Sequence, residues 1–284
     1  MSKLRVNGVE VYYEEQGSGS ETIVFAHGLG LSSRMFDDQV ATLRDRYRCI
    51  AFDFRGQGQS ETTRTGYDME TVTADSAALI GALNCAPCHF VGLSMGGVVG
   101  MLLAIGRPEF IRSLTLIAAT ADSEAGSKKA LYLLLSLIAR LFGTGATAKQ
   151  GMQVLFGNKF LTDPAREAER QEWLQRMSSS SGVGFARAML GVINRKDIAS
   201  EIGKITAPTL ILVGDQDKAQ GPDKSQRIHE RIPWSKLVII PCAGHSSTIE
   251  EPAAVTAEII AFLTNVATGR NSFTEEKHPL NNWW

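Results

Sequence analysis

The sequence lacks the features by which several classes of protein are recognised. Its 284 residues include only four cysteines, too few for the disulfide framework of a small secreted domain. The longest apolar-rich segment, 130–142, is too short to span a bilayer and is interrupted by Ser136 and Arg140. The N-terminus shows no basic segment followed by an apolar one, as a signal peptide would. These absences predict a soluble cytoplasmic protein without membrane contact.

The charge balance excludes a second group of functions. The chain has 29 basic and 30 acidic residues, giving a net charge of −1, and no cluster of basic residues stands out. A nucleic-acid partner is therefore not expected, because such proteins carry a basic patch or stripe. No repeat at a fixed period is visible. With 44% hydrophobic residues, the chain can bury one large core, with or without an insert.

Short apolar runs alternate with amphipathic segments along most of the chain. This pattern is typical of a mostly parallel sheet with helices on both faces, an α/β fold. The predicted strands are 9–14, 22–26, 47–54, 89–93, 114–118, 209–213 and 237–240. The predicted helices are 33–44, 67–83, 95–106 and 252–263.

One region departs from this alternation. Residues 121–195 show helical patterns and no convincing strand, with a break at the serine-rich stretch 178–182. We interpret this region as a helical cap or lid inserted into a core formed by residues 1–120 and 196–267. Residues 268–284 follow the last predicted helix as a polar tail.

A single serine stands among glycines where an apolar strand ends. Gly92-Leu93-Ser94-Met95-Gly96 is a sharp turn from the strand into the following helix. Such a turn holds its central residue in a strained conformation and requires small neighbours two positions away on either side. The helix N-terminus adds free N–H groups next to the serine oxygen. The pattern predicts Ser94 as a nucleophile.

A serine hydroxyl needs a base to take its proton and an acid to orient that base. Among the five histidines, His245 follows the strand 237–240 in a loop at the end of the sheet that also carries Ser94. We predict that His245 is the base. The other histidines suit structural roles or lie in polar segments: His27, His89, His229 and His278.

Two aspartates follow the strand 209–213, at the correct end of the sheet to be the acid. We predict Asp217 as the orienting carboxylate and Asp215 as a turn residue. Along the chain the order is then serine, aspartate, histidine, which is the order expected when the serine lies on a strand-to-helix turn of such a sheet. The oxyanion of a tetrahedral intermediate would be bound by the backbone N–H groups of Met95 and Leu29.

The chain resembles the α/β-hydrolase superfamily over residues 9–263. Within that superfamily, the serine turn and His27-Gly-Leu-Gly30 are most similar to the 3-oxoadipate enol-lactonase group and related bacterial carboxylesterases. The resemblance implies the α/β-hydrolase fold and agrees with Asp217 as the acid. It rests on five motifs in order: His27-Gly28, Asp53–Ser60, Gly92–Gly97, Gly214–Asp217 and Gly244-His245.

The predicted function is a serine hydrolase that cleaves a carboxylic ester through an acyl-enzyme. Alternatives are an enol-lactonase-like lactone hydrolase, a C–C bond hydrolase or perhydrolase of the same fold, and a ligand receptor that keeps the triad. No cofactor is needed. No metal is expected either, because the Cys85-Ala-Pro-Cys88 pair has no second pair to complete a zinc site.

Two further expectations concern the lid and the tail. The lid segment 131–142 carries eight large apolar residues, and some should line the pocket above Ser94. It offers few cations, so a neutral, small to medium, mainly apolar ester is favoured over a carboxylated lactone. The eight apolar residues are Leu131, Leu133, Leu134, Leu135, Leu137, Ile138, Leu141 and Phe142.

The tail ends in Trp283-Trp284. We predict that one of these tryptophans docks into an apolar groove on its own or a neighbouring molecule, and in the second case the tail would join a homo-oligomer.

Overall fold

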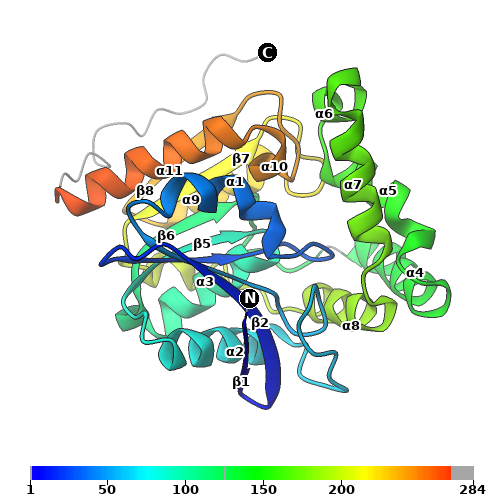
Figure 1. Cartoon of the computed structure of the whole chain (residues 1–284), viewed down its shortest axis with the longest axis horizontal. Helices are drawn as coiled ribbons and strands as arrows, with labels where there is room; N and C mark the ends of the chain where they lie inside the picture. Colours follow the sequence, from blue (N-terminus) through cyan, green and yellow to red (C-terminus); the bar gives the residue numbers. More distant parts are fainter. Residues whose placement is uncertain (1, 125, 270–284) are drawn as a thin grey trace.

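A computed structural model describes residues 2–124 and 126–269 of the chain, without the side chains of Ser127 and Lys128. Its centre is an eight-stranded sheet in the order β1-β2-β4-β3-β5-β6-β7-β8 (Figure 1). The strands from β4 to β8 in this order run parallel, and β1 and β2 are antiparallel. The strands are β1 (Ser2–Val6), β2 (Val9–Gln16), β3 (Thr22–Ala26), β4 (Arg48–Phe52), β5 (Cys88–Leu93), β6 (Ile111–Ile117), β7 (Thr209–Gly214) and β8 (Ser235–Ile240).

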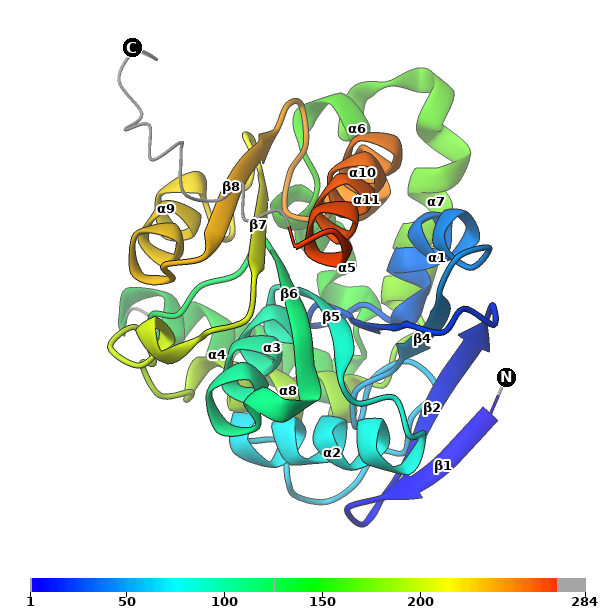
Figure 2. The ribbon, with the colours of Figure 1, turned by 90° about the vertical axis from the view of Figure 1, so that its left-hand side faces the viewer.

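Helices cover both faces of this sheet, as the alternation of apolar runs predicts. Figure 2 shows α1 and α11 on one side of the sheet and α3 and α9 on the other. Each side has its own cluster of buried apolar side chains, and the central strands β3 and β5 are wholly buried. The core helices are α1 (Asp37–Leu43), α2 (Met69–Ala82), α3 (Met95–Gly106), α9 (Pro222–Arg231), α10 (Ser247–Glu250) and α11 (Pro252–Ala267).

The described residues of the insert between β6 and β7 form five α-helices and two short 3₁₀ helices, and no strand (Figure 1). We call α4 to α8 the lid helices. That this insert acts as a lid stays a prediction. The lid helices are α4 (Gly126–Phe142), α5 (Gly145–Leu155), α6 (Asn158–Thr162), α7 (Glu167–Ser178) and α8 (Gly182–Ile193).

The helices and strands of the structure differ from the predicted ones mainly at their ends and at the edge of the sheet. Strand β1 is absent from the prediction; it is a short edge strand of five residues, and most of its side chains are exposed. The predicted helix 33–44 divides into a 3₁₀ turn, Ser33–Phe36, and α1. Helix α2 begins one residue after Asp68, whose carboxylate accepts a hydrogen bond from the Thr71 N–H at 2.8 Å.

The sequence analysis also makes predictions about membrane-spanning segments, metal ligands and the C-terminal tryptophans. In residues 2–124 and 126–269, no helix is long and apolar enough to cross a membrane. The same residues contain no cluster of three potential metal ligands, and all four cysteines are free. The predicted docking of Trp283 or Trp284 lies outside the described residues.

Candidate active site

The turn between β5 and α3 has the strained geometry predicted for a nucleophile. Ser94 adopts a φ of 53° and a ψ of −109°, in a region that residues other than glycine rarely occupy. A Cβ atom on Gly92 would lie 2.3 Å from the Gly96 carbonyl oxygen, and one on Gly96 would lie 2.0 Å from that of Ala26. Both positions therefore require glycine. The turn lifts the Ser94 side chain above the carboxyl edge of the sheet, into a pocket.

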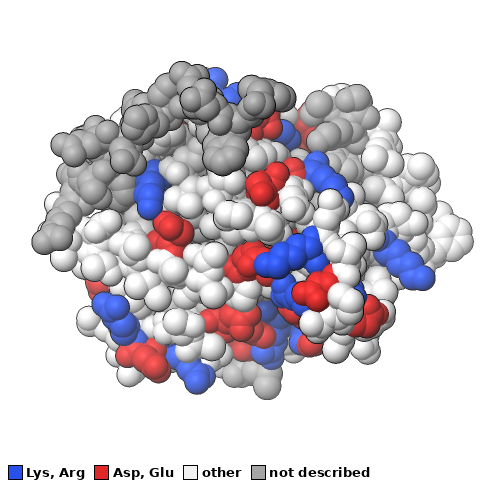
Figure 3. Space-filling view, turned by 90° about the horizontal axis from the view of Figure 1, so that it is seen from above, with Lys and Arg blue, Asp and Glu red and all other residues white. Residues whose placement is uncertain are grey.

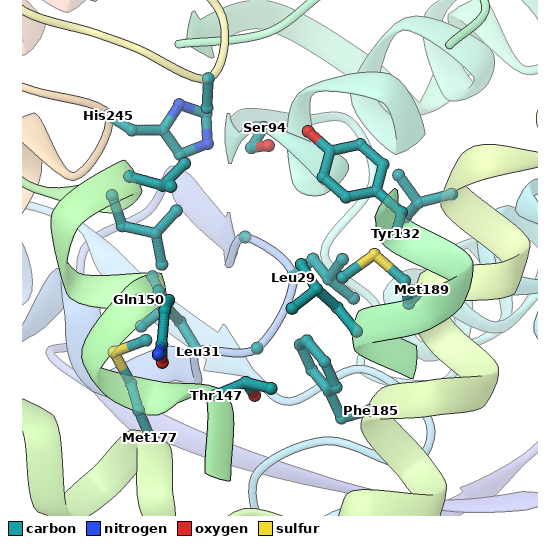
Figure 4. Close-up of a pocket in the computed structure, with 18 of the residues that line it drawn as sticks. Leu29, Leu31, Ser94, Tyr132, Thr147, Gln150, Met177, Phe185, Met189 and His245 are labelled. Carbon is teal, nitrogen blue, oxygen red and sulfur yellow. The ribbon is translucent and has the colours of Figure 1, made fainter. Parts of the chain in front are cut away.

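His245 and Asp217 meet next to this serine. The Nδ1 atom of His245 lies 2.9 Å from Oδ2 of Asp217, and both side chains are at most 5% exposed. With Nδ1–H donating to the carboxylate, Nε2 is the ring nitrogen left to accept a proton. His245 and Ser94 line the same pocket, and Figure 4 shows the imidazole next to the serine side chain. The arrangement can activate a hydroxyl by general-base catalysis.

The structure distinguishes the two candidate aspartates. Asp215 is exposed, whereas Asp217 is buried against the imidazole. The second oxygen of Asp217, Oδ1, accepts hydrogen bonds at 2.8 Å from the N–H groups of Ala219 and Gln220. Burial raises the pKa of Asp217, but the charge and hydrogen bond of His245 and these two N–H groups outweigh it, so the pKa is lowered overall. Asp217 is therefore held as a carboxylate that can orient the imidazole and stabilise its protonated form.

The predicted oxyanion donors are the residue after Ser94 and a residue of a loop that lines the same pocket. Leu29 belongs to the loop after β3 and lines the pocket, and Met95 is the first residue of α3. Within the described residues, neither backbone N–H has an acceptor among the loop and turn hydrogen bonds. Free N–H groups beside the nucleophile can bind the charge that develops on a carbonyl oxygen.

Buried side chains behind the Leu29 loop hold it in place. His27 accepts a hydrogen bond from the Phe54 N–H through Nε2 at 3.0 Å, so its Nδ1–H donates to the Gly28 carbonyl at 2.7 Å. Burial lowers the pKa of His27, which keeps the ring neutral for this role. Gln57 accepts from the Gly30 N–H at 2.8 Å and reaches the Met95 sulfur at 3.7 Å. Gln57, which the sequence analysis leaves without a role, thus connects the loop that carries Leu29 with the side chain of Met95.

Glu250 joins the lid to the loop that carries His245. Its Oε2 atom accepts hydrogen bonds from the N–H of Gly157, at 2.7 Å, and of Gly244, at 2.9 Å. A Cβ atom on Gly244 would lie only 2.4 Å from the Gly157 nitrogen, so the two backbones approach as only glycine permits. Burial raises the pKa of Glu250 to about 7, against the opposing effect of these N–H groups and of His245.

Two more hydrogen bonds fasten the same part of the lid to the catalytic loops. The Ser246 N–H donates to the Leu155 carbonyl at 2.9 Å, and the Asn158 N–H donates to the Gln216 side chain at 2.7 Å. Ser246 follows His245 and Gln216 precedes Asp217, so both loops are tied to one lid segment, 155–158. Sequence reasoning misses this link because its partners are 58 or more residues apart and mostly use backbone atoms.

The pocket above Ser94 is lined mainly by apolar side chains from the lid. Of the eight apolar residues predicted to supply it from α4, only Leu135 lines it, together with Tyr132 (Figure 4). Most of the others are exposed on the outer side of α4. The apolar lining comprises Leu29, Leu31, Leu93, Leu135, Ala148, Val154, Leu155, Met177, Phe185, Met189, Val192 and Ala219.

A small polar group interrupts this lining. Figure 4 shows the Tyr132 ring with its hydroxyl directed toward Ser94. Glu124 also lines the pocket, and its carboxylate lies 3.5 Å from the guanidinium of Arg195, with both side chains 4% exposed. Burial, with the nearby Glu124 charge, raises the pKa of Tyr132, so its hydroxyl stays protonated.

The remaining histidines and the cysteine pair lie elsewhere. His89 is buried near the start of β5, with Nδ1 2.8 Å from the Ser113 hydroxyl, away from the edge that carries Ser94. His229 lies on α9 and contacts the Ser235 hydroxyl, so it is partly buried rather than fully solvated. Cys85 and Cys88 are buried thiols whose pKa values burial raises, to about 11 for Cys85.

Fold and site together define a class. An eight-stranded, mostly parallel sheet presents a serine on a strained strand-to-helix turn, with histidine and aspartate on the loops after β8 and β7. Residues 23–259 match the model of the alpha/beta hydrolase family. The chain belongs to that family and is a hydrolase, as the sequence motifs indicate.

Individual relatives are similar over nearly the whole chain. The protein named "Putative carbamate hydrolase RutD" from Variovorax paradoxus is 30% identical over 268 residues, covering 90% of this chain and 97% of the relative. A thermophilic esterase from Thermogutta terrifontis has a TM-score of 0.88 at 27% identity, covering 94% of this chain and 99% of its own. An enol-lactonase from Burkholderia xenovorans has a TM-score of 0.87 at 27% identity, covering 93% and 100%.

Proposed function

We propose that the protein is a serine esterase that cleaves neutral carboxylic esters of small to medium, mainly apolar substrates through an acyl-enzyme. Ser94 attacks the ester carbonyl while His245 takes its proton, and Asp217 orients the imidazole and stabilises its charge. The N–H groups of Leu29 and Met95 bind the oxyanion. His245 then returns the proton to the leaving alcohol, and a water molecule, activated by the same imidazole, releases the acid.

The observation that carries this proposal is the contact of His245 with the Asp217 carboxylate at 2.9 Å beside a strained serine. The lining of the pocket supports the substrate class. A cavity of about 190 Å³ lined mainly by apolar side chains, among them Leu135, Met189 and Phe185, suits an apolar acyl or alcohol group of modest size.

The charges at the pocket favour a neutral substrate. Among the described residues, no lysine or arginine lines the pocket, while the carboxylate of Glu124 does. The nearest buried cation, Arg195, is already paired with that carboxylate. A carboxylated lactone would therefore bring a second negative charge to Glu124 without a free cation to receive it, which is costly in a buried site.

A lactone hydrolase is the second candidate. The likeness to the enol-lactonase from Burkholderia xenovorans favours it, since a lactone is an internal ester and would use the same residues. The likeness to RutD extends the choice to a carbamate, whose carbonyl accepts the same attack. Perhydrolase or C–C bond hydrolase activity, and a ligand receptor with the same residues, remain the further alternatives of this fold.

The test begins with the nucleophile. Ser94→Ala is expected to reduce ester turnover by several orders of magnitude and to abolish labelling by a fluorophosphonate, with folding unchanged by circular dichroism. Retained labelling would contradict Ser94 as the nucleophile. A wild-type protein that is labelled once but fails to turn over any ester would support the receptor instead.

The substrate class is tested on the wild-type protein. The ratio kcat/KM is compared for neutral p-nitrophenyl esters of increasing acyl length, a neutral lactone, an aryl carbamate and a carboxylated enol-lactone. We expect the neutral esters to exceed the carboxylated lactone by at least tenfold. The reverse order by a similar factor would favour the lactonase and refute the charge argument.

A further inference from the structure

The lid exposes an unusual amount of apolar surface. Of the ten large hydrophobic side chains exposed in the described residues, nine belong to α4, α5 and α8, and the tenth is Trp234. Helix α4 provides six of them, and Phe142 at its end is 75% exposed. The six are Leu131, Leu133, Leu134, Leu137, Leu141 and Phe142.

These six residues lie on one side of α4. At 100° per residue they fall within roughly half of the helix circumference. The opposite side is already in use: Tyr132 and Leu135 line the pocket, and the Ser136 hydroxyl donates to the Ala186 carbonyl on α8 at 3.1 Å. The exposed side therefore has no packing partner in the described residues, although it is as apolar as a buried helix face.

The charges around this side all have one sign. The sequence has no Asp or Glu from residue 125 to residue 162, nor from 173 to 196. Helices α4 and α5 carry Lys128, Lys129, Arg140 and Lys149. Among the ion pairs of the part of the chain that the structure describes, none involves Lys129, Arg140 or Lys149. By helical geometry, Lys129 and Arg140 border the leucines on the side of Leu133 and Leu137.

The position of α4 makes this surface accessible. Figure 1 shows α4 and α5 at the outer end of the molecule, away from the sheet. In Figure 3 the end of the molecule that carries the lid is largely without charged residues, apart from a basic side chain. Val154 on α5 is also exposed, and it lines the pocket that contains Ser94.

We propose that the outer side of α4 is a docking surface for an anionic lipid bilayer. A helix with a continuous apolar side, bordered by cations and without carboxylates, lies in the plane of such a surface with its apolar side buried among the acyl chains. The lack of a spanning segment, which excludes membrane contact in the sequence analysis, does not bear on this peripheral contact. The proposal is independent of the proposed function, because it concerns binding alone.

The experiment measures binding of the full-length protein to sedimented vesicles. Vesicles of phosphatidylcholine with 30 mol% phosphatidylglycerol, which carry negative charge, are compared with vesicles of phosphatidylcholine alone. We expect binding to the anionic vesicles, weakened by 0.5 M NaCl, and little binding to the neutral ones. Absence of binding to anionic vesicles at low salt would overturn the proposal.

Two pairs of substitutions separate the apolar and the ionic contributions. Leu137→Gln with Leu141→Gln should reduce the partition coefficient roughly tenfold or more. Lys129→Gln with Arg140→Gln should reduce it by roughly fivefold per charge removed. Trp234→Gln, which removes an exposed apolar side chain outside the lid, is the matched control and should leave binding unchanged.

Two other occupants of this surface would give different results. If the protein is a dimer in light scattering and Leu137→Gln makes it a monomer, the surface joins two copies of the chain. If only a chain ending at Gly269 binds vesicles, the remaining segment covers the surface in the whole protein. Either result, or unchanged vesicle binding in both double variants, would overturn the proposal.

Discussion

Glu250→Gln should raise the stability of the protein, relative to the wild type, by more at alkaline pH than at acid pH. Glu250 is 2% exposed, and its pKa is raised from 4.5 to about 7. Between these values the folded state binds a proton that the unfolded state has released. The stability from this group is therefore complete below pH 4.5 and is lost as the pH rises through 7.

The size of the effect follows from the shift. Burial is the largest cause of the raised pKa, and the difference of roughly 2.5 pKa units corresponds to about 3 kcal/mol. Glutamine can keep one oxygen as the acceptor for Gly157 and Gly244 and carries no charge at any pH. Its amide nitrogen would replace Oε1, which has no hydrogen-bond partner in the described structure. The replacement of Oε1 by nitrogen lowers the unfolding free energy by the same amount at both pH values. It therefore cancels when the effect of Glu250→Gln at one pH is subtracted from its effect at the other.

The assay is equilibrium urea unfolding of the wild type and Glu250→Gln at pH 4.5 and pH 8.5, analysed by linear extrapolation. The difference in unfolding free energy between the two proteins should increase by about 3 kcal/mol from the lower to the higher pH. Glu251→Gln is the matched control. Its carboxylate forms a partly exposed ion pair with Lys159, worth at most about 1 kcal/mol, so no comparable pH dependence is expected. A difference that does not change with pH for Glu250→Gln would refute the reasoning.

Three further outcomes are expected. Asp217→Asn should lower kcat by roughly three to four orders of magnitude, and Asp215→Asn by less than tenfold, because of the two only Asp217 contacts His245. Equal losses of kcat in a steady-state ester assay would contradict the assignment of Asp217 as the acid. Gly96→Ala should prevent folding or abolish activity because its Cβ would lie 2.0 Å from the Ala26 carbonyl oxygen. Gly81→Ala, which places a Cβ in open space, should leave the midpoint of thermal unfolding unchanged or raise it. Tyr132→Phe should change kcat/KM for esters without altering thermal stability, since the hydroxyl faces the pocket rather than the core; identical kinetics would show that it does not contact the substrate.

The sequence by itself determines the class of fold and the positions of the main chemical groups. Buried strands such as β3 and β5 are continuous apolar runs, and their order with the intervening helices indicates the parallel sheet. The Gly-x-Ser-x-Gly turn is visible because its geometry demands particular residues at fixed local spacing. His245 and Asp217 can be predicted as the base and the acid because each follows a recognisable strand at the same edge of the sheet.

Only the tertiary structure decides how segments distant in the sequence meet. The contact of Glu250 with Gly157 joins positions 93 residues apart through one carboxylate and a backbone N–H, and no local pattern signals it. The direction of the α4 leucines is equally undetermined by the sequence, because an apolar helix side looks the same whether it faces a pocket or lies exposed. Here α4 packs against α8 in such a way that Tyr132 and Leu135 line the pocket and the remaining leucines lie exposed on the outer side.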